Sequence, residues 1–378
     1  MTKILGPPSY ENWTVSQSGK QADDAYECPL FTDADINGEA LEGYGPYQFL
    51  NAGHIYGPSG GIRSAIFLRV EWYRQLSTMH DFSPMDKTDL GYYHGGDAND
   101  EIAALMSLAL GARIKAGGIT REFKRGRDPR GWPCSWDFHY DPVFTKSTSG
   151  EVVPSATGKR SLDDLQPLQL LPRMTPSAAI ALIRSARLYQ EALWIAEAEP
   201  SLSWLLLVSS IEVAAVCWRS SEESSVERLI TARPQLVELL RSTQIPNLVE
   251  QVAAEIAPSL GATKKFIDFL ITFLPSAPIS RPPIKEQISW EERNLKDIFS
   301  KIYGHRSHAL HGGTPFPQPM CQTAFKREDW DAPYEKPYGL ASSFLGGTWL
   351  VEDTPLLLHT FEYIARGALL KWWHSLVP

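Results

Sequence analysis

The sequence is poor in cysteine, and its four cysteines lie far apart. They show no C-x-x-C spacing, which argues against a structural zinc site and against a dense disulfide framework. Cysteines used this sparsely fit a reducing compartment. We therefore expect a cytoplasmic protein without metal ions or other cofactors. The cysteines are Cys28, Cys134, Cys217 and Cys321.

An excess of positive charge is also missing. The 378 residues include 36 Lys and Arg against 44 Asp and Glu, which gives a formal net charge of −8. A protein that coats nucleic acid through its overall charge is strongly basic, so that class is excluded and any nucleic-acid site must be local. With 43% hydrophobic residues the chain has enough apolar material for buried cores, which excludes disorder for most of it.

Long apolar runs are scarce as well. The first residues, MTKILGPPSYENW, contain no apolar segment typical of a secretory signal. The most apolar stretch, Trp204 to Trp218, is predicted to be too short to span a bilayer and carries Glu212. No repeat with the period of a solenoid is present. We therefore expect no membrane insertion.

The first part of the chain, residues 1–150, predicts an α+β domain. Strand-like runs lie at Ala65 to Tyr73 and Ser135 to Tyr140. Between them a helix is predicted from Asp97 or Asn99, either of which can cap it, to about Lys115, with Gly117-Gly118 ending it. We assign this domain to no family and expect it to recognise RNA or an activating signal. Residues 151–173 are polar and rich in turn residues, which predicts a linker or exposed loop.

Residues 174–378 predict a bundle of helices. Thr175-Pro176 is typical of a helix start, and Pro200 ends the apolar pattern that follows. S-W-E-E at Ser289 predicts a capping box that opens a long helix ending at Gly312-Gly313. The remaining helices are predicted from Ser201 or Ser203 to Cys217, Val226 to Thr231, Gln235 to Leu240, Pro246 to Ile256, Thr263 to Phe273 and Asp353 to Trp373.

One local stretch is strongly basic. Between Arg113 and Arg130 lie seven basic residues against Glu122 and Asp128. A solvated loop and a surface that contacts a phosphate backbone are about equally good interpretations. The residues that would contact RNA are Arg121, Lys124, Arg125, Arg127 and Arg130.

The segment IYGHRSHALHGG, at the end of the long predicted helix, carries the most specific chemistry. It places Arg306 and His311 in an R-x4-H arrangement. A histidine in the last turn of a helix is suited to proton transfer near neutral pH, and the arginine fork matches phosphate oxygens. Five residues correspond to about 140° of rotation around a helix, so the long arginine side chain or a second subunit must close the gap. Both residues are also ordinary at a helix end, where they cap carbonyl groups.

The sequence resembles the HEPN ribonuclease superfamily, and is most similar to its Apea-like branch. The resemblance rests on Ile302-Tyr303, Arg306-Ser307 and His311-Gly312-Gly313, and on the preceding helices, including SWLLLVSSIEVAA. It covers roughly residues 175–315. It implies a helical homodimer in which two R-x4-H motifs face one cleft and cleave RNA without a metal, as in toxins and anti-phage effectors.

By this resemblance Arg306 would hold the scissile phosphate while His311 takes part in proton transfer. The ribose 2′-hydroxyl would attack, leaving a 2′,3′-cyclic phosphate. Ser307 occupies the polar position beside the arginine, where many relatives carry asparagine, aspartate or histidine. His308 is expected to line the same cleft, whereas His305 is expected at the surface.

Glu212 interrupts an apolar helix and needs a partner, because an unpaired buried carboxylate is costly. Arg306 or His311 is one candidate, and a structural pair with Arg219 or another cation is the alternative. Two further hypotheses remain open for the whole chain. One is a non-catalytic helical module that binds a nucleotide or a partner protein, and the other is a structural dimerisation domain in which His311 only caps its helix.

Overall fold

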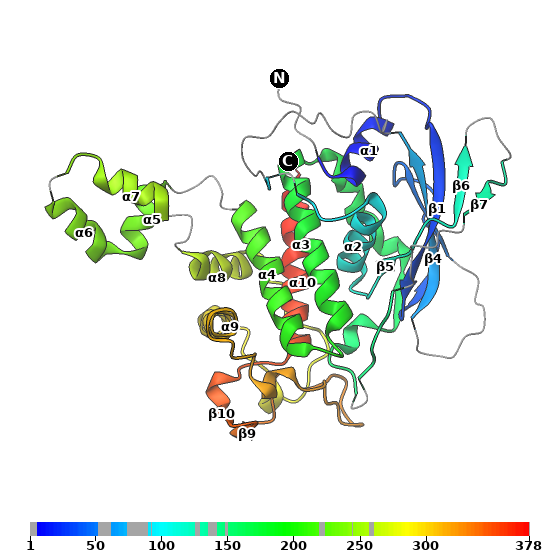
Figure 1. Ribbon diagram of the computed structural model, residues 1–378. Helices are drawn as coiled ribbons and strands as arrows, with labels where there is room; N and C mark the ends of the chain where they lie inside the picture. The colour runs from blue at the N-terminus through cyan, green and yellow to red at the C-terminus, as the bar shows by residue number, and fades with distance from the viewer. Residues whose placement is uncertain are drawn as a thin grey trace.

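The computed structural model describes residues 6–51, 62–73, 90–91, 93–124, 129–134, 142–147, 150–218, 224–243, 245–256 and 261–377. A sheet-rich N-terminal region is followed by a mostly helical C-terminal part, as the sequence predicts (Figure 1). The sheet lies at one side of the molecule, and α2 (Ala98–Leu110) separates it from a layer formed by α3 (Pro176–Ile195) and α10 (Leu358–Ser375).

The main sheet is antiparallel and is built around β1 (Asp24–Thr32). β4 (Arg63–Trp72) pairs with β1 so that Cys28 faces Leu68, and this strand confirms the one predicted at Ala65 to Tyr73. Along β4 alternate residues are buried, which places one face of the sheet against the core. The other strands are β3 (Tyr47–Asn51), β5 (Lys115–Ala116), β6 (Arg121–Lys124) and β7 (Trp132–Pro133). The strand expected at 135–140 lies outside the described residues.

The N-terminal region also contains two helices, α1 (Pro8–Ser16) and α2. Asp97 caps α2 in a capping box with Asp100, as predicted. The predicted end of this helix at Lys115 is wrong. The helix ends at Leu110 because Gly111 adopts a left-handed conformation, with φ of 62°, and Lys115 then pairs with β1 in β5.

The helical part follows the predicted order. Beyond α3 its helices are α4 (Pro200–Trp218), α5 (Ser225–Ala232), α6 (Pro234–Ser242), α7 (Leu248–Ile256), α8 (Ala262–Thr272), α9 (Glu292–Gly312) and α10. Two predicted starts are wrong. Extended backbone continues to Glu291, because Ile288 and Trp290 bond to Glu335 and Pro275, so no capping box forms at Ser289. α10 begins at Leu358 instead of Asp353, which belongs to the 3₁₀ turn η7 (Val351–Asp353).

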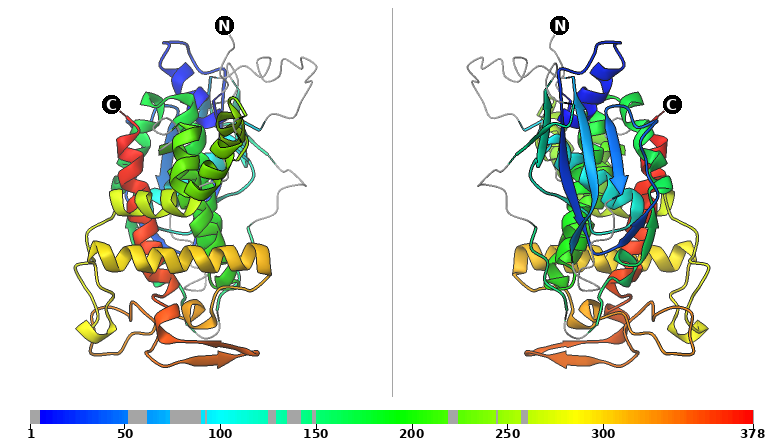
Figure 2. Two further views of the ribbon diagram at one scale, coloured as in Figure 1. Left: turned by 90° about the vertical axis from the view of Figure 1, so that its left-hand side faces the viewer. Right: turned by 90° about the vertical axis from the view of Figure 1, so that its right-hand side faces the viewer.

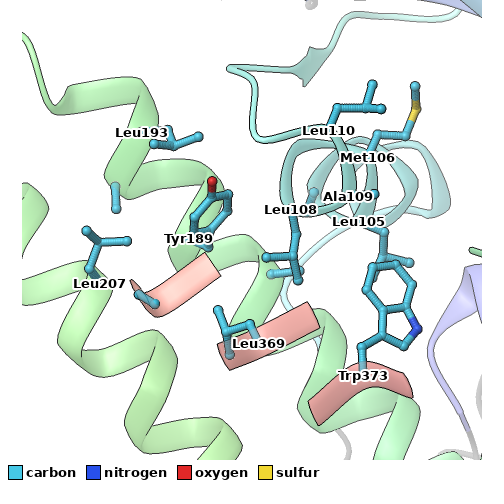
Figure 3. Packing of buried hydrophobic residues seen from close by; sticks show 14 of the residues in the cluster. Leu105, Met106, Leu108, Ala109, Leu110, Tyr189, Leu193, Leu207, Leu369 and Trp373 are labelled. Atoms are coloured by element: carbon cyan, nitrogen blue, oxygen red, sulfur yellow. The ribbon is translucent and has the colours of Figure 1, made fainter. Parts of the chain in front are cut away.

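One hydrophobic core joins both halves of the chain. Leu369 and Trp373 of α10 lie against the leucines of α2, and Tyr189 and Leu193 of α3 complete this cluster (Figure 3). Deeper in the helical part, Trp204 of α4 is stacked between Phe316 and Phe361, with ring centroids 5.1 and 4.9 Å away.

Residues 151–173 are part of this core, so the expected linker or exposed loop is wrong. They form η2 (Pro154–Ala156), β8 (Lys159–Ser161) and the 3₁₀ helix η3 (Leu162–Arg173). β8 pairs in parallel with β2 (Asp35–Asn37). The side chains that η3 turns inward are fully buried, and they are Leu162, Leu165, Leu168 and Leu171.

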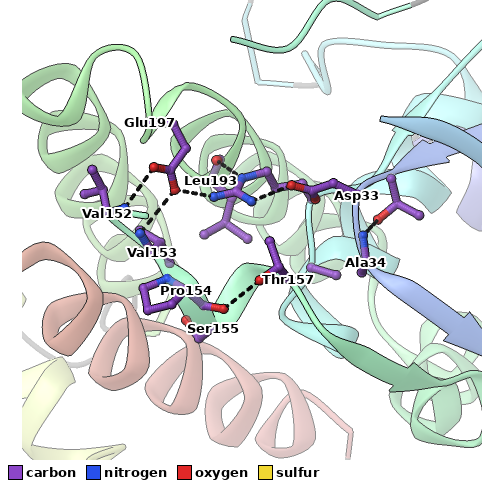
Figure 4. Close-up of polar contacts among 12 residues, drawn as sticks. Asp33, Ala34, Val152, Val153, Pro154, Ser155, Thr157, Leu193 and Glu197 are labelled. Atoms are coloured by element: carbon purple, nitrogen blue, oxygen red, sulfur yellow. Dashed lines mark hydrogen bonds and ion pairs between the residues drawn. The ribbon is translucent and has the colours of Figure 1, made fainter. Parts of the chain in front are cut away.

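Buried ion pairs fasten the strand region to the helices. Arg113, only 1% exposed, donates to Asp33 at 2.8 Å and to Glu197 at 2.6 Å. Glu197 also accepts hydrogen bonds from the backbone of Val152 and Val153 (Figure 4). One arginine therefore links three segments that are distant in the sequence.

Among the described residues, α4 is the one helix whose length and composition would be enough to cross a membrane. The stretch from Trp204 to Trp218, which was expected to be too short to span a bilayer, is part of this 19-residue helix. α4 packs against α3, α8 and α10, and its inward residues, including Trp204 and Leu207, are buried. These contacts cover part of its apolar surface, whereas Leu202 and Val216 are exposed.

Candidate functional site

α9 carries the R-x4-H motif and runs across the ends of the upright helices (Figure 2). The helix ends as predicted. Gly313 adopts a left-handed conformation with φ of 65°, and its N–H donates to the carbonyl of His308. Below α9 lies a hairpin of β9 (Ser342–Phe344) and β10 (Gly347–Trp349).

Arg306 is oriented by the carboxylate of Glu212 on α4. Its Nη2 donates to Oε2 of Glu212 at 2.7 Å, which confirms Arg306 as the predicted partner of that carboxylate. The alternative partner Arg219 lies outside the described residues. Both side chains of the pair are 20% exposed, so the pair is mostly shielded while remaining accessible from solvent.

Tyr303 is the second donor to the same carboxylate. Its hydroxyl donates to Oε1 of Glu212 at 2.8 Å, and the Arg306 guanidinium lies 5.5 Å from the centre of its ring. Burial, and then the hydrogen bond to Glu212, raises the pKa of Tyr303 to about 12. The hydroxyl therefore stays protonated and remains a donor at neutral pH. Tyr303 and Arg306 are three residues apart and share one face of α9, toward α4.

The guanidinium of Arg306 retains donors for another group. Among the described residues, Glu212 is its only hydrogen-bond partner. Its Nε is buried and has no partner there. Because Nε is buried, a further anion can reach only the exposed part of this planar fork, beside the carboxylate of Glu212.

His311 points away from this pair. It is exposed in the last turn of α9, about 140° around the helix from Arg306, and about 7.5 Å farther along its axis. His308 is also exposed, and Ser307 is half-buried without a side-chain bond to any described residue. One copy of the chain therefore brings Arg306, Tyr303 and Glu212 together and leaves His311 separate.

His305 does not lie free at the surface as expected. It is half-buried, and its Nε2 lies 2.7 Å from the carbonyl oxygen of Asp353. Burial lowers the pKa of this imidazole. Lys301, one turn earlier, donates to the carbonyl of Glu352. These two bonds attach α9 to η7.

Two residues of the basic stretch, Arg113 and Lys115, lie apart from the predicted RNA contacts, whereas Arg121, Lys124 and Arg130 lie partly exposed on β6 and in the turn that follows it. Arg113 is internal, and Lys115 donates to Glu191 at 2.8 Å. On β6, Arg121 donates to the carbonyl of Arg130, and Lys124 lies 3.6 Å from Glu122. Arg125 and Arg127 lie outside the described residues.

Tyr303 belongs to the motif but is not among the site residues that the sequence predicts. The signal was its spacing of three residues from Arg306, which places both on one helix face.

The described residues contain no group of three or more His, Cys, Asp or Glu side chains arranged to hold a metal ion. Comparison of the chain with models of protein families, with curated proteins and with solved structures finds no match.

Proposed function

We propose that this chain is a metal-independent endoribonuclease of the HEPN type that acts as a homodimer in the cytoplasm. The observation that supports this proposal best is the arrangement of the side chains around the R-x4-H motif on α9. Glu212 and Tyr303 hold Arg306 from one side, while His311 stands exposed in the last turn. A toxin or an anti-phage effector is the class of protein that this proposal implies.

Two copies are needed because one copy keeps Arg306 and His311 apart. In the proposed dimer the two α9 ends face one cleft, so that the arginine of either copy meets a histidine. Symmetry doubles the number of cations in the cleft. This local charge is what a protein with a net charge of −8 needs in order to bind RNA.

In the proposed reaction the exposed part of the Arg306 guanidinium binds the non-bridging oxygens of the scissile phosphate. His311 accepts the proton of the ribose 2′-hydroxyl as the 2′-oxygen attacks phosphorus. The bond from phosphorus to the 5′-oxygen breaks, that oxygen takes a proton from water, and His311 then returns the proton it accepted to the solvent. The products are a 2′,3′-cyclic phosphate and a 5′-hydroxyl. Glu212 and Tyr303 orient Arg306, and Ser307 and His308 lie beside the reacting groups.

The test incubates total cellular RNA with the wild type and with His311→Ala in EDTA, followed by analysis of the fragment ends. We expect 2′,3′-cyclic phosphate ends from the wild type, and a rate lowered about a hundredfold to ten-thousandfold in the variant. His374→Ala is the matched control, because His374 is exposed in the last turn of α10. Equal cleavage by the wild type and His311→Ala would contradict the proposal.

Arg306→Lys is a second variant that keeps a positive charge beside Glu212 but removes the planar fork. We expect it to lose cleavage while keeping its fold, because lysine binds phosphate only as a point charge.

The ion pair between Arg306 and Glu212 also favours the second hypothesis, a non-catalytic module. There the arginine would serve structure or anion binding alone. RNA binding that weakens with salt, with no cleavage by the wild type, would favour it.

A further inference from the structure

A cavity of about 340 Å³ lies on the side of the molecule where α10 begins. Four segments line it: η2, residues 278–282 ahead of α9, residues 332–335, and the first turns of α10. Its volume is within the range of small-molecule sites. Figure 4 shows Ser155 of its wall beside α10.

The wall of this cavity is mostly apolar and rigid. Its apolar part consists of Pro154, Pro278, Pro282, Pro333, Ala332 and the ring of Tyr363. Proline fixes its own backbone, so a wall of this composition loses little conformational freedom when a ligand binds. The apolar faces of the proline rings and the planar ring of Tyr363 can pack against a flat, apolar ligand.

The cavity offers no net charge. Its one charged side chain, Glu335, is 5% exposed and receives two hydrogen bonds of 2.6 Å from Arg281 and one of 2.7 Å from the backbone of Ile288. A charged ligand would have to give up its hydration without an opposite charge in return, which is costly. The occupant is therefore uncharged.

Most of the hydrogen-bond donors in the cavity wall already donate to other groups of the protein. Ser155 donates to Glu362, Thr360 donates to the carbonyl of Glu335, and Tyr363 donates to the carbonyl of Ser276. Their oxygens remain as acceptors. A ligand therefore has to bring hydrogen-bond donors of its own.

His359 supplies the most specific acceptor. Its Nε2 lies 2.7 Å from the carbonyl oxygen of Tyr334, which only accepts, so Nε2 carries the hydrogen. Burial lowers the pKa of His359 to about 4, so the ring is neutral at pH 7. Nδ1 is then an unprotonated acceptor, and no described residue bonds to it.

We propose that this cavity binds an uncharged heteroaromatic molecule whose ring N–H donates to Nδ1 of His359. The proline and tyrosine rings contact the faces of the ligand, and the hydrogen bond fixes its orientation. The site is separate from the motif on α9, and the inference does not rest on the proposed ribonuclease activity.

The test measures binding of indole, benzimidazole and adenine by ligand-observed NMR and calorimetry at neutral pH. We expect at least one dissociation constant of about 1 mM or below, as is usual for ligands of this size. Two analogues isolate the inferred features. 1-Methylindole lacks the donor and should bind about tenfold more weakly than indole, and indole-3-acetate carries a charge and should bind more weakly still.

Ala332→Trp locates the site, because it fills the cavity without removing a polar contact. It should abolish binding, whereas Asp331→Trp, at the exposed neighbouring position, should not. In the wild type, binding should shift the ¹⁵N resonance of His359 Nδ1. Absence of binding by all three probes, unchanged binding by Ala332→Trp, or equal affinity for indole and indole-3-acetate would overturn the inference.

Discussion

Arg306 is held by a single carboxylate that it shares with Tyr303, so the position of the guanidinium depends on three side chains from two helices. The sequence indicated the pair of Arg306 and Glu212, because a carboxylate in an apolar helix needs a cation. A pair with Arg219, which lies outside the described residues, was an equally good interpretation of the sequence. The structure establishes the pair with Arg306 by a distance of 2.7 Å across the fold, and spacing along the chain does not contain such distances.

Tyr303→Phe tests this arrangement at the level of one hydrogen bond. Removing the hydroxyl leaves Oε1 of Glu212 without its donor, so we expect the free energy of unfolding to fall by about 1 kcal/mol. Urea denaturation measures it. Tyr338→Phe is the control, because Tyr338 is exposed and its hydroxyl makes no bond with described residues. Equal effects of the two variants would show that the hydroxyl contributes nothing.

His359 makes stability depend on pH. Its pKa is lowered from 6.5 to about 4 by burial, so between these values the unfolded chain binds a proton that the folded chain does not. The contribution of His359 to the free energy of unfolding is therefore fully present above pH 6.5. As the pH falls from 6.5 toward 4, the free energy of unfolding decreases by at most about 1.4 kcal/mol per pH unit. His305 contributes with the same sign.

Urea denaturation between pH 7 and 4.5 measures this slope. His359→Gln should make it shallower, while His374→Gln, which changes an exposed histidine, should leave it unchanged. An unchanged slope in His359→Gln would show that this imidazole is not the group that titrates.

At the scale of elements, the predictions succeeded where the apolar pattern has the period of an α-helix or a strand, as in α3, α4 and β4. They failed at η3. Its leucines recur every third residue, which is the period of a 3₁₀ helix, and Pro167 and Pro172 interrupt the segment. The segment was predicted to be a linker from its polar and turn-rich composition, because its spacing of leucines matches neither the α-helical nor the β-strand period.

Leu165→Ala tests whether η3 belongs to the core. A fully buried leucine leaves a cavity when truncated, so we expect a loss of about 2–5 kcal/mol in the free energy of unfolding. Gln166→Ala, the exposed neighbour, should change it by less than about 0.5 kcal/mol. A small effect of Leu165→Ala would mean that the segment is the linker expected from composition.

At the scale of the whole molecule, one core and the Arg113 ion pairs join the strand region to the helices. These pairs connect Arg113 to residues 80 and 84 positions away, whereas the sequence places Arg113 at the start of a basic stretch expected to be a solvated loop or a phosphate-contacting surface. Pairs between residues this far apart in the sequence form only in the folded chain. Local composition therefore does not predict that Arg113 is buried.

The proposed activity requires two copies of the chain. We expect sedimentation velocity at micromolar concentration to give twice the mass of one chain, and His311→Ala to leave that mass unchanged because His311 is exposed at the helix end. A monomer at these concentrations would contradict the shared cleft, since one copy separates Arg306 from His311.

The most direct test of the central claim compares two oligonucleotides of one sequence, one of RNA and one with 2′-deoxyribose throughout, in EDTA. We expect the wild type to cleave only the RNA, and His311→Ala to cleave the RNA about a hundredfold to ten-thousandfold more slowly and the deoxy strand not at all. Cleavage of the deoxy strand, or cleavage of RNA by both proteins at one rate, would contradict attack by the 2′-hydroxyl with His311 as the proton acceptor.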